Sequence, residues 1–230
     1  MELVKKPLRV LVVGLGWVTT NRHLPVMTAS PDYEVVGVAD RRPERAESVA
    51  KKFNVPNFYS SPALEENQDL GEVPWLDGVD AVTIGTSPFS HHGLTMSALR
   101  LGKHVLTEKP FAMNPEEGEE MVALARERGL TLSVVHNFQF ARSMQRLLKD
   151  IEDGKLGKIQ GVSGVVFGNP KRRLPDWYEG LPLGLYYDES PHLYYLLRAI
   201  APGTLKSLQT VSFGSTKGHV TPAGFFQHFR

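Results

Sequence analysis

Short apolar runs and amphipathic stretches alternate along the first 136 residues of the chain. Five runs centre on Val, Leu or Ile and have the length of buried strands: residues 8–13, 33–39, 80–86, 103–108 and 130–136. The stretches between them have helical spacing of apolar positions: residues 17–29, 43–53, 91–101 and 114–129. Strands separated by helices of about ten residues or more predict right-handed crossovers and a parallel sheet. We therefore predict an α/β fold with a doubly wound parallel sheet, and we place the first domain at residues 1–136.

Residues that favour helix ends fall at the borders of these stretches. Gly102 suits the position after a helix. Asn114, with Glu117 three residues later, is typical of a helix N-cap. Ser61 predicts the start of another short helix, directly after a short strand at residues 58–59.

The pattern changes after residue 136. We expect a helix at 141–153, a strand at 158–167, an irregular stretch at 168–187, a short helix at 191–200 and a strand at 205–213. This order predicts a partial, shortened α+β domain at residues 137–230 with a mainly antiparallel sheet. Irregular stretches of this length in compact domains are usually functional or mobile.

The first strand is followed by a glycine turn, a helix, a second strand and an acidic residue. Gly14 permits the tight turn, and Gly16 lets a pyrophosphate approach the backbone at the helix N-terminus. Asp40, at the end of the second strand, can accept hydrogen bonds from an adenosine ribose. Thr19 stands where the usual fingerprint has its third glycine. The order predicts a dinucleotide site of the Rossmann type; the alternative is that both glycines serve only a sharp strand-to-helix turn.

Composition and charge narrow the class of protein. The 230 residues carry 26 basic and 25 acidic side chains, and this balance points to neither nucleic acid nor a membrane surface as a partner. The chain has no cysteine, which excludes disulfides and cysteine metal sites and fits a reducing compartment. No run of about 18 apolar residues occurs, and the first apolar run is too short for a signal peptide. We therefore expect a cytoplasmic protein.

Four short motifs point to a known family. Three lie between residues 80 and 110: Thr86-x-Pro88 with His91 three residues later, Gly102-Lys103-His104-Val105, and Glu108-Lys109-Pro110. The fourth is Asp188-x-x-x-His192, with Gly184 four residues before it. Together they resemble the Gfo/Idh/MocA oxidoreductases, named for glucose-fructose oxidoreductase, inositol dehydrogenase and a rhizopine catabolism protein. The Glu-Lys-Pro tripeptide is the most diagnostic of the four, and the resemblance covers residues 8–200.

The resemblance implies an NAD(P)-dependent dehydrogenase or reductase that acts on CH–OH groups of a sugar, cyclitol or related polyhydroxy compound. It implies no metal site. The catalytic residues would be Lys109, Asp188 and His192. The cofactor-binding residues would be Gly14, Gly16, Trp17, Val18, Asp40, Arg41, Thr86, Pro88, His91, Glu108 and Lys109, with Glu108 holding either the cofactor or the turn of its own tripeptide.

The residue types suit this chemistry. Oxidation of an alcohol needs a base for the hydroxyl proton, and the imidazole of His192 is suited to that role near neutral pH. Asp188 would fix the imidazole tautomer or relay the proton. Lys109 would stabilise a developing alkoxide by its positive charge.

Each of these residues also has a structural alternative. Lys109 would then be a solvated lysine after a strand, and Asp188 a loop acid or helix cap. His192 would cap the short helix or pack against Tyr195. His23, in the first helix, is expected to be an ordinary core or surface residue.

The sequence favours NAD over NADP without settling the choice. A carboxylate at Asp40 accepts bonds from a ribose 2′-OH and repels a 2′-phosphate. Arg41 and Arg42 follow it directly, and arginines next to that position can instead hold the phosphate of NADP.

The length departs from the family, whose members usually continue into a broader antiparallel sheet. A shortened sheet exposes unpaired edges, so we expect a homo-oligomer that forms through the C-terminal sheet. The alternatives to an enzyme are a catalytically silent dinucleotide-binding regulatory protein and a truncated, inactive family member.

Overall fold

The computed structural model describes residues 6–66, 68–164, 174–201, 203, 207–213 and 224–229. The chain divides into two compact units, Met1–Val135 and His136–Arg230.

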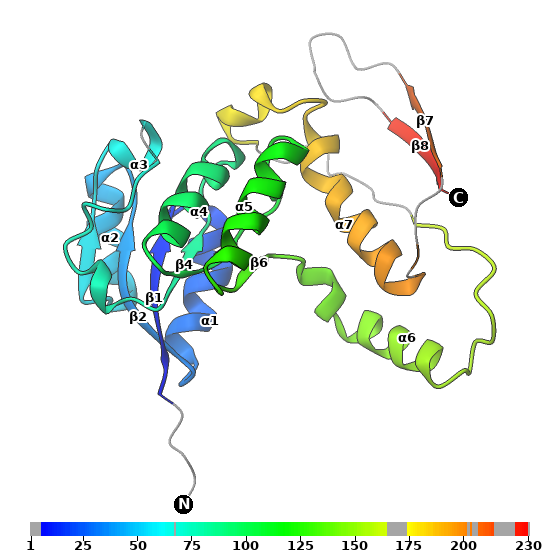
Figure 1. The fold of residues 1–230 in the computed structure, drawn as a ribbon, viewed down its shortest axis with the longest axis horizontal. Helices are drawn as coiled ribbons and strands as arrows, with labels where there is room; N and C mark the ends of the chain where they lie inside the picture. The colour runs from blue at the N-terminus through cyan, green and yellow to red at the C-terminus, as the bar shows by residue number, and fades with distance from the viewer. Residues whose placement is uncertain are drawn as a thin grey trace, which may run out of the picture. The chain divides into compact units, whose positions relative to one another are not determined.

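The first unit is built on a six-stranded parallel sheet (Figure 1). Its strands are β1 (Leu8–Val13), β2 (Tyr33–Ala39), β3 (Asn57–Tyr59), β4 (Ala81–Ile84), β5 (His104–Thr107) and β6 (Leu132–Val134). They lie in the order β3-β2-β1-β4-β5-β6, and every neighbouring pair is parallel. The order reverses between β1 and β4, and the carboxyl ends of strands at such a point are where open α/β sheets bind ligands. The predicted doubly wound parallel sheet is confirmed.

Helices cover both faces of this sheet. They are η1 (Thr19–His23), α1 (Leu24–Ala29), α2 (Pro43–Phe53), α3 (Ala63–Glu66), α4 (His91–Arg100) and α5 (Pro115–Glu127), with 3-10 turns at η2 (Leu76–Gly78) and η3 (Pro88–Ser90). The η1 segment is a π-helix that continues into α1, so one helix runs from residue 17 to Ala29 as the spacing predicts.

Alternation along β1 divides the core into two layers. Val10 and Val12 belong to a cluster with apolar residues of α1 and α2. Leu11 and Val13 belong to the opposite cluster, which includes apolar residues of α4 and α5. All four side chains are at most 1% exposed. A central strand buried on both faces explains why this run is apolar throughout instead of alternating with polar residues.

The predicted cap of α5 is present. Asn114 Oδ1 accepts a hydrogen bond from the Glu117 backbone N–H at 2.8 Å. The Glu117 carboxylate in turn accepts one from the Met113 N–H at 2.9 Å. These bonds satisfy backbone donors that a helix start leaves without intrahelical partners.

In its described residues, the second unit has four helical segments, the first of them a single 3-10 turn, and two strands. They are η4 (Asn137–Phe140), α6 (Arg142–Glu152), η5 (Asp176–Gly180), α7 (Leu185–Ile200), β7 (Leu208–Phe213) and β8 (Gly224–Phe229). The two strands pair antiparallel with each other. The helix expected at 141–153 agrees with α6, and the strand expected at 205–213 agrees with β7 over the residues that are described.

Two expectations for this unit are wrong. Residues 158–164 form no strand, and the rest of the expected strand at 158–167 lies outside the described residues. A β-favouring run becomes a strand only where a partner strand accepts its hydrogen bonds, and none of the described strands pairs with it. The helix expected at 191–200 begins six residues earlier, at Leu185, with Pro191 inside it. The end of the irregular stretch expected at 168–187 is therefore helical, and its beginning lies partly outside the described residues.

Thr19 occupies the place of the third glycine because Gly85 supplies the room. The third glycine normally permits close packing between the helix and the sheet. Thr19 is fully buried, and its hydroxyl lies against Gly85, the residue after β4. A Cβ atom built on Gly85 would lie only 2.2 Å from Thr19 Oγ1. The space that a third glycine would leave in the helix is thus provided by the glycine that follows β4.

We expect Gly85→Ala to lower the free energy of unfolding by about 1–3 kcal/mol, because its methyl group would overlap the Thr19 hydroxyl. Thr19→Ala removes that hydroxyl, which has no hydrogen-bond partner among the described residues. The double variant should therefore recover most of the loss caused by Gly85→Ala. Denaturant unfolding of the four proteins measures this, and strictly additive effects would contradict the compensation.

Candidate active site

Three residues predicted to bind the cofactor lie at one edge of the sheet, after the carboxyl ends of β1, β2 and β4: Gly14, Asp40 and Thr86. Gly14 follows β1 and has a φ of +82°, which an L side chain rarely adopts. A Cβ on it would also lie 2.5 Å from Cγ2 of Thr86, in the segment after β4. Only glycine meets both conditions, so the turn can pass this close to β4.

The helix start after Gly16 has room for an anion. A Cβ built on Gly16 would have only the Gly85 carbonyl oxygen near it, at 3.9 Å. The chain is helical from residue 17, and Trp17 and Val18 are exposed. The first N–H groups of a helix have no intrahelical acceptor and attract phosphate oxygens. The glycine turn and the helix start therefore fit the pyrophosphate of a dinucleotide.

Asp40 anchors the glycine turn as well as ending β2. Its side chain is 6% exposed. Its Oδ2 accepts a hydrogen bond from the Leu15 N–H at 2.9 Å, and its Oδ1 accepts one from the Arg42 N–H at 3.0 Å. A carboxylate has about four acceptor positions, so capacity for a ribose hydroxyl is left.

Glu108 links the Glu-Lys-Pro tripeptide to the first helix. Its Oε1 lies 2.7 Å from Nε2 of His23, and both side chains are largely buried. Its Oε2 accepts a hydrogen bond from the Lys109 N–H at 3.1 Å. Of the two roles implied for Glu108, these contacts favour holding the turn. His23, expected to be an ordinary residue of the helix, is the partner that sequence reasoning missed, and no short-range signal points to a residue 85 positions away.

His91 joins the loop after β4 to the loop after β5. It is fully buried, with Nδ1 at 2.7 Å from the Pro110 carbonyl oxygen and Nε2 at 3.4 Å from the Thr86 carbonyl oxygen. Burial lowers the pKa of His91, which favours the neutral ring. With both nitrogens near backbone carbonyls, His91 is placed to act on a nucleotide site indirectly, by holding the Lys109–Pro110 segment, whose peptide bond is cis.

Three further predicted residues lie in this unit: Pro88, Lys109 and Arg41. Pro88 is buried at the start of η3, where the Ser90 hydroxyl donates to Thr86 Oγ1 at 2.8 Å. Lys109 follows β5, and its backbone is fixed on both sides by the contacts of Glu108 and Pro110. Arg41 pairs with Glu65 of α3.

Asp188 and His192 lie four residues apart on α7 and so share one face of that helix. The carboxylate of Asp188 accepts a hydrogen bond from the Tyr178 hydroxyl. Nδ1 of His192 lies 2.7 Å from the Tyr195 hydroxyl oxygen, which itself accepts a bond from the Phe138 N–H at 3.1 Å. The contact with Tyr195 expected under the structural alternative is present, and it fixes the orientation of the imidazole.

The ring contacts around His192 are close. The Phe138 ring centroid lies 4.4 Å from that of His192, and the His136 ring stacks on Tyr195 at 4.3 Å. Burial raises the pKa of Tyr195, so its hydroxyl stays protonated near neutral pH. Lys109 belongs to the first unit, whereas Asp188 and His192 belong to the second.

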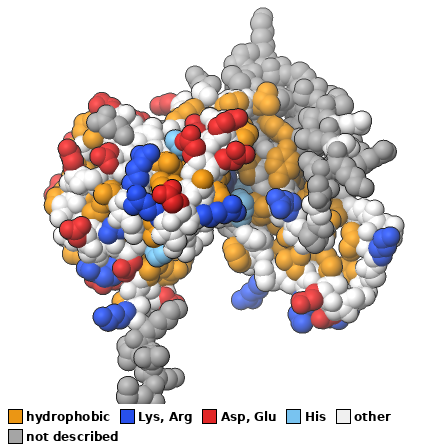
Figure 2. Space-filling model, in the orientation of Figure 1, with side chains coloured by type: hydrophobic (Ala, Val, Ile, Leu, Met, Phe, Trp, Pro, Cys, Tyr) orange, Lys and Arg blue, Asp and Glu red, His pale blue; other side chains and the backbone are white. Residues whose placement is uncertain are grey.

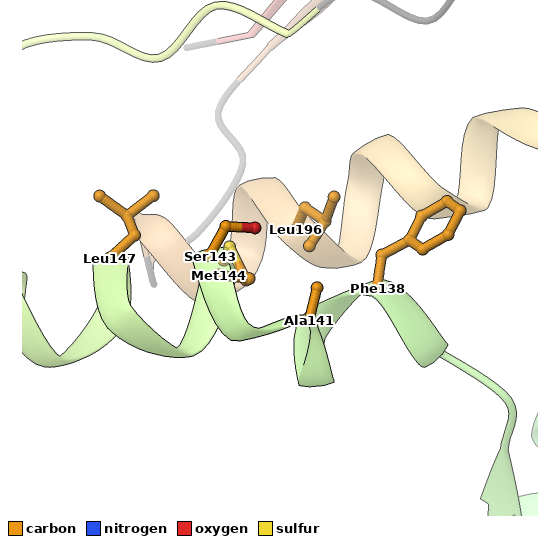
Figure 3. Close-up of a pocket in the computed structure, with 6 residues that line it drawn as sticks. All are labelled: Phe138, Ala141, Ser143, Met144, Leu147 and Leu196. Atoms are coloured by element: carbon orange, nitrogen blue, oxygen red, sulfur yellow. The ribbon is translucent and has the colours of Figure 1, made fainter.

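The second unit also contains an apolar groove (Figure 3). Its lining comes from η4, the residue after it, α6 and α7, and consists of Phe138, Ala141, Ser143, Met144, Leu147 and Leu196. None of these side chains is an acid, a base or a cation, so the groove supplies no group for proton transfer. Within the described residues, no group of three or more His, Asp or Glu side chains is arranged to hold a metal ion. The helices of this part of the chain also lack the length and hydrophobicity of a membrane span.

We expect the contact between His23 and Glu108 to be a strong one. Removing either partner leaves a buried polar group unsatisfied, so a double-mutant cycle of His23→Ala and Glu108→Ala should give a coupling energy of about 1–3 kcal/mol. The matched control is His92 with Glu120, which are 2.9 Å apart with side chains 29% and 62% exposed. Its coupling should stay below about 1 kcal/mol. Equal couplings for the two pairs would contradict this account.

The buried imidazole of His91 should make stability depend on pH. Its pKa is lowered in the folded chain from the usual 6.5. Below that pH the unfolded chain takes up a proton that the folded chain does not, so stability is lost as pH falls, by at most about 1.4 kcal/mol per pH unit. The contribution is fully present above pH 6.5.

The measurement compares the wild type with His91→Gln by denaturant unfolding between about pH 8 and pH 5. The stability advantage of the wild type should shrink as the pH falls. His92→Gln is the control, because that ring is partly exposed and pairs with a surface carboxylate. Parallel curves for wild type and His91→Gln would show that His91 is not the residue responsible.

Comparison with known proteins agrees with this geometry. A family model described as "Oxidoreductase family, NAD-binding Rossmann fold" (GFO_IDH_MocA) matches residues 8–136. The chain is 35% identical over 167 residues to the dTDP-3,4-didehydro-2,6-dideoxy-alpha-D-glucose 3-reductase of Actinomadura kijaniata, a match that covers 72% of this chain and 47% of that protein. It is 32% identical over 157 residues to the D-glucoside 3-dehydrogenase of Escherichia coli (strain K12), covering 68% and 42%. The chain thus spans about half the length of these relatives.

A solved structure is similar over the same region. The 3-ketoreductase of Actinomadura kijaniata, in complex with NADP, is 34% identical and superimposes with a TM-score of 0.56 over 67% of this chain and 46% of that chain. The family model covers more than half of the 230 residues. This chain therefore belongs to the Gfo/Idh/MocA oxidoreductase family, with its NAD-binding Rossmann fold.

Proposed function

We propose that this protein is an NAD(P)-dependent oxidoreductase that transfers a hydride between the nicotinamide and a hydroxyl or carbonyl carbon of a sugar, cyclitol or related polyhydroxy compound. One observation carries the proposal. The glycine turn, Asp40 and the fixed Glu108-Lys109-Pro110 segment lie at the carboxyl ends of three strands of one sheet, β1, β2 and β5, on both sides of the point where the strand order reverses. That is the place where such sheets bind dinucleotides.

The chain's residues would divide the chemistry among them. The nicotinamide, when bound, supplies the hydride chemistry. Lys109 would place a positive charge where an alkoxide develops, on a backbone that Glu108 holds by a hydrogen bond. His192 would exchange a proton with a substrate hydroxyl. Its Nδ1 contacts the Tyr195 hydroxyl, and its Nε2 lies 4.0 Å from a carboxylate oxygen of Glu189. Asp188 lies one turn earlier on the same face of α7, held by Tyr178.

The substrate class rests on the named relatives. A 3-reductase of a dTDP-linked deoxysugar and a D-glucoside 3-dehydrogenase both change the oxidation state of one ring carbon. On the face of the first unit that Figure 2 shows, Lys and Arg side chains lie among Asp and Glu side chains. This mixture is unlike the basic stripe of nucleic-acid-binding proteins, and it fits a small-molecule substrate.

A silent nucleotide-binding regulator and a truncated, inactive family member are the other candidates. Retention of Lys109, Asp188 and His192 favours the enzyme, because a regulator needs none of these groups. Homo-oligomerisation through the C-terminal sheet and a cytoplasmic location are further parts of the proposal. The sheet of β7 and β8 supports homo-oligomerisation. Among the described residues these two strands pair only with each other, so each has an edge at which a strand of a second copy could pair.

The experiment measures binding of NADH and NADPH to the purified chain, and then nicotinamide absorbance with a panel of sugars and inositols. We expect binding and turnover of at least one polyol or its ketone. Lys109→Ala should lower turnover by about 100- to 1,000-fold while nucleotide binding changes much less. Lys52→Ala, in the last turn of α2, is the control for loss of a lysine. Binding without turnover would favour the regulator or the inactive member, and absence of binding would refute the nucleotide site.

A further inference from the structure

Two arginines follow β2, and the structure places a carboxylate against each of them. Nε of Arg42 lies 3.3 Å from Oδ1 of Asp40. The guanidinium of Arg41 pairs with the carboxylate of Glu65, which belongs to α3 and lies 24 positions later in the sequence. The two positive charges next to the expected adenosine ribose are therefore balanced by two negative ones.

This balance bears on the choice between NAD and NADP. The two nucleotides differ in one phosphate, on the 2′-oxygen of the adenosine ribose, and proteins that accept it offer an arginine near the end of the second strand. A phosphate at that position would have to displace Glu65 from Arg41 and would meet its charge as well as that of Asp40. The ribose 2′-OH of NAD is neutral and meets neither cost.

The effect of Asp40 on the choice between NAD and NADP cannot be separated from its effect on binding as a whole. Its Oδ2 holds the Leu15 N–H in the glycine turn, so its replacement would disturb the binding of both nucleotides. Glu65 differs in this respect. Its side chain is half-exposed and belongs to α3. Among the described residues, its carboxylate accepts a hydrogen bond from Arg41.

We propose that Glu65 is a specificity-determining residue, which holds Arg41 in an ion pair and thereby favours NAD over NADP. The proposal rests on the function proposed above, and it adds a residue outside the motifs that identify the family. It also assigns this chain a preference opposite to the NADP bound by the 3-ketoreductase of Actinomadura kijaniata.

The test measures the dissociation constants of NADH and NADPH for the purified chain by titration, without any turnover. The wild type should bind NADH more tightly. Glu65→Gln keeps the shape of the side chain and removes its charge, so the ratio of the NADPH constant to the NADH constant should fall by about three- to tenfold. Glu66→Gln, at the neighbouring exposed carboxylate of α3, changes the net charge equally and should leave the ratio within about twofold of the wild type.

A second pair of variants tests whether Glu65 acts through Arg41. In the Arg41→Gln background, Glu65→Gln should change the ratio much less than it does alone. Tighter binding of NADPH by the wild type, an unchanged ratio in Glu65→Gln, an equal shift in Glu66→Gln, or an undiminished effect without Arg41 would each overturn the proposal. If neither nucleotide binds the wild type, the proposed function fails and this inference fails with it; all the other outcomes concern Glu65 alone.

Discussion

Close contact between two backbone segments, at the carboxyl ends of β1 and β4, governs the rest of the nucleotide-binding edge. A Cβ on Gly14 would lie 2.7 Å from the backbone nitrogen of Thr86, so the turn after β1 touches the segment after β4 directly. Gly85 and Thr19 make a second close contact between the same two segments. Here the Thr19 side chain, in the first helix, occupies space that Gly85, after β4, leaves open. Because both approaches require glycine, the position of the helix start relative to β4 is set by backbone contact instead of by adjustable side chains.

Polar side-chain contacts connect this backbone arrangement to the residues with proposed chemical roles. Asp40 holds the glycine turn through Leu15. Glu108 joins the first helix to the backbone of Lys109, and His91 holds the next residue, Pro110, from the opposite loop. Each of these side chains is mostly buried, where a satisfied hydrogen bond is more valuable and an unsatisfied one more costly than in water. Lys109 is thus held through its main chain, which leaves the conformation of its side chain to be set by other contacts.

The sequence predicted the first unit well because the signals there are local. Buried strands such as β1 and β4 appear as continuous apolar runs, and Asn114 marks the start of α5 by its own side chain. It failed where the deciding contact is distant. The pairing of His23 with Glu108 spans 85 positions, and that of Arg41 with Glu65 depends on the placement of a helix of four residues. In the second unit, the short helix was expected at residues 191–200, but the helix begins at Leu185, and a hydrogen bond between Tyr178 and Asp188 holds the turn before Pro191. The strand expected from residue 158 lacked a described partner.

The π-helical segment η1 has a consequence for how the first helix tolerates change. An α-helix turns by about 100° per residue, so a segment with wider hydrogen-bonded rings alters the phase of everything after it. Trp17 and Val18, before this segment, are exposed, whereas Leu24 and Met27, after it, enter the core. His23 stands at the junction and bonds to Glu108. The length of this wider turn therefore sets the rotation between the exposed start of the helix and the core-packed α1, and adding or removing one residue here would rotate one part relative to the other by about 100°.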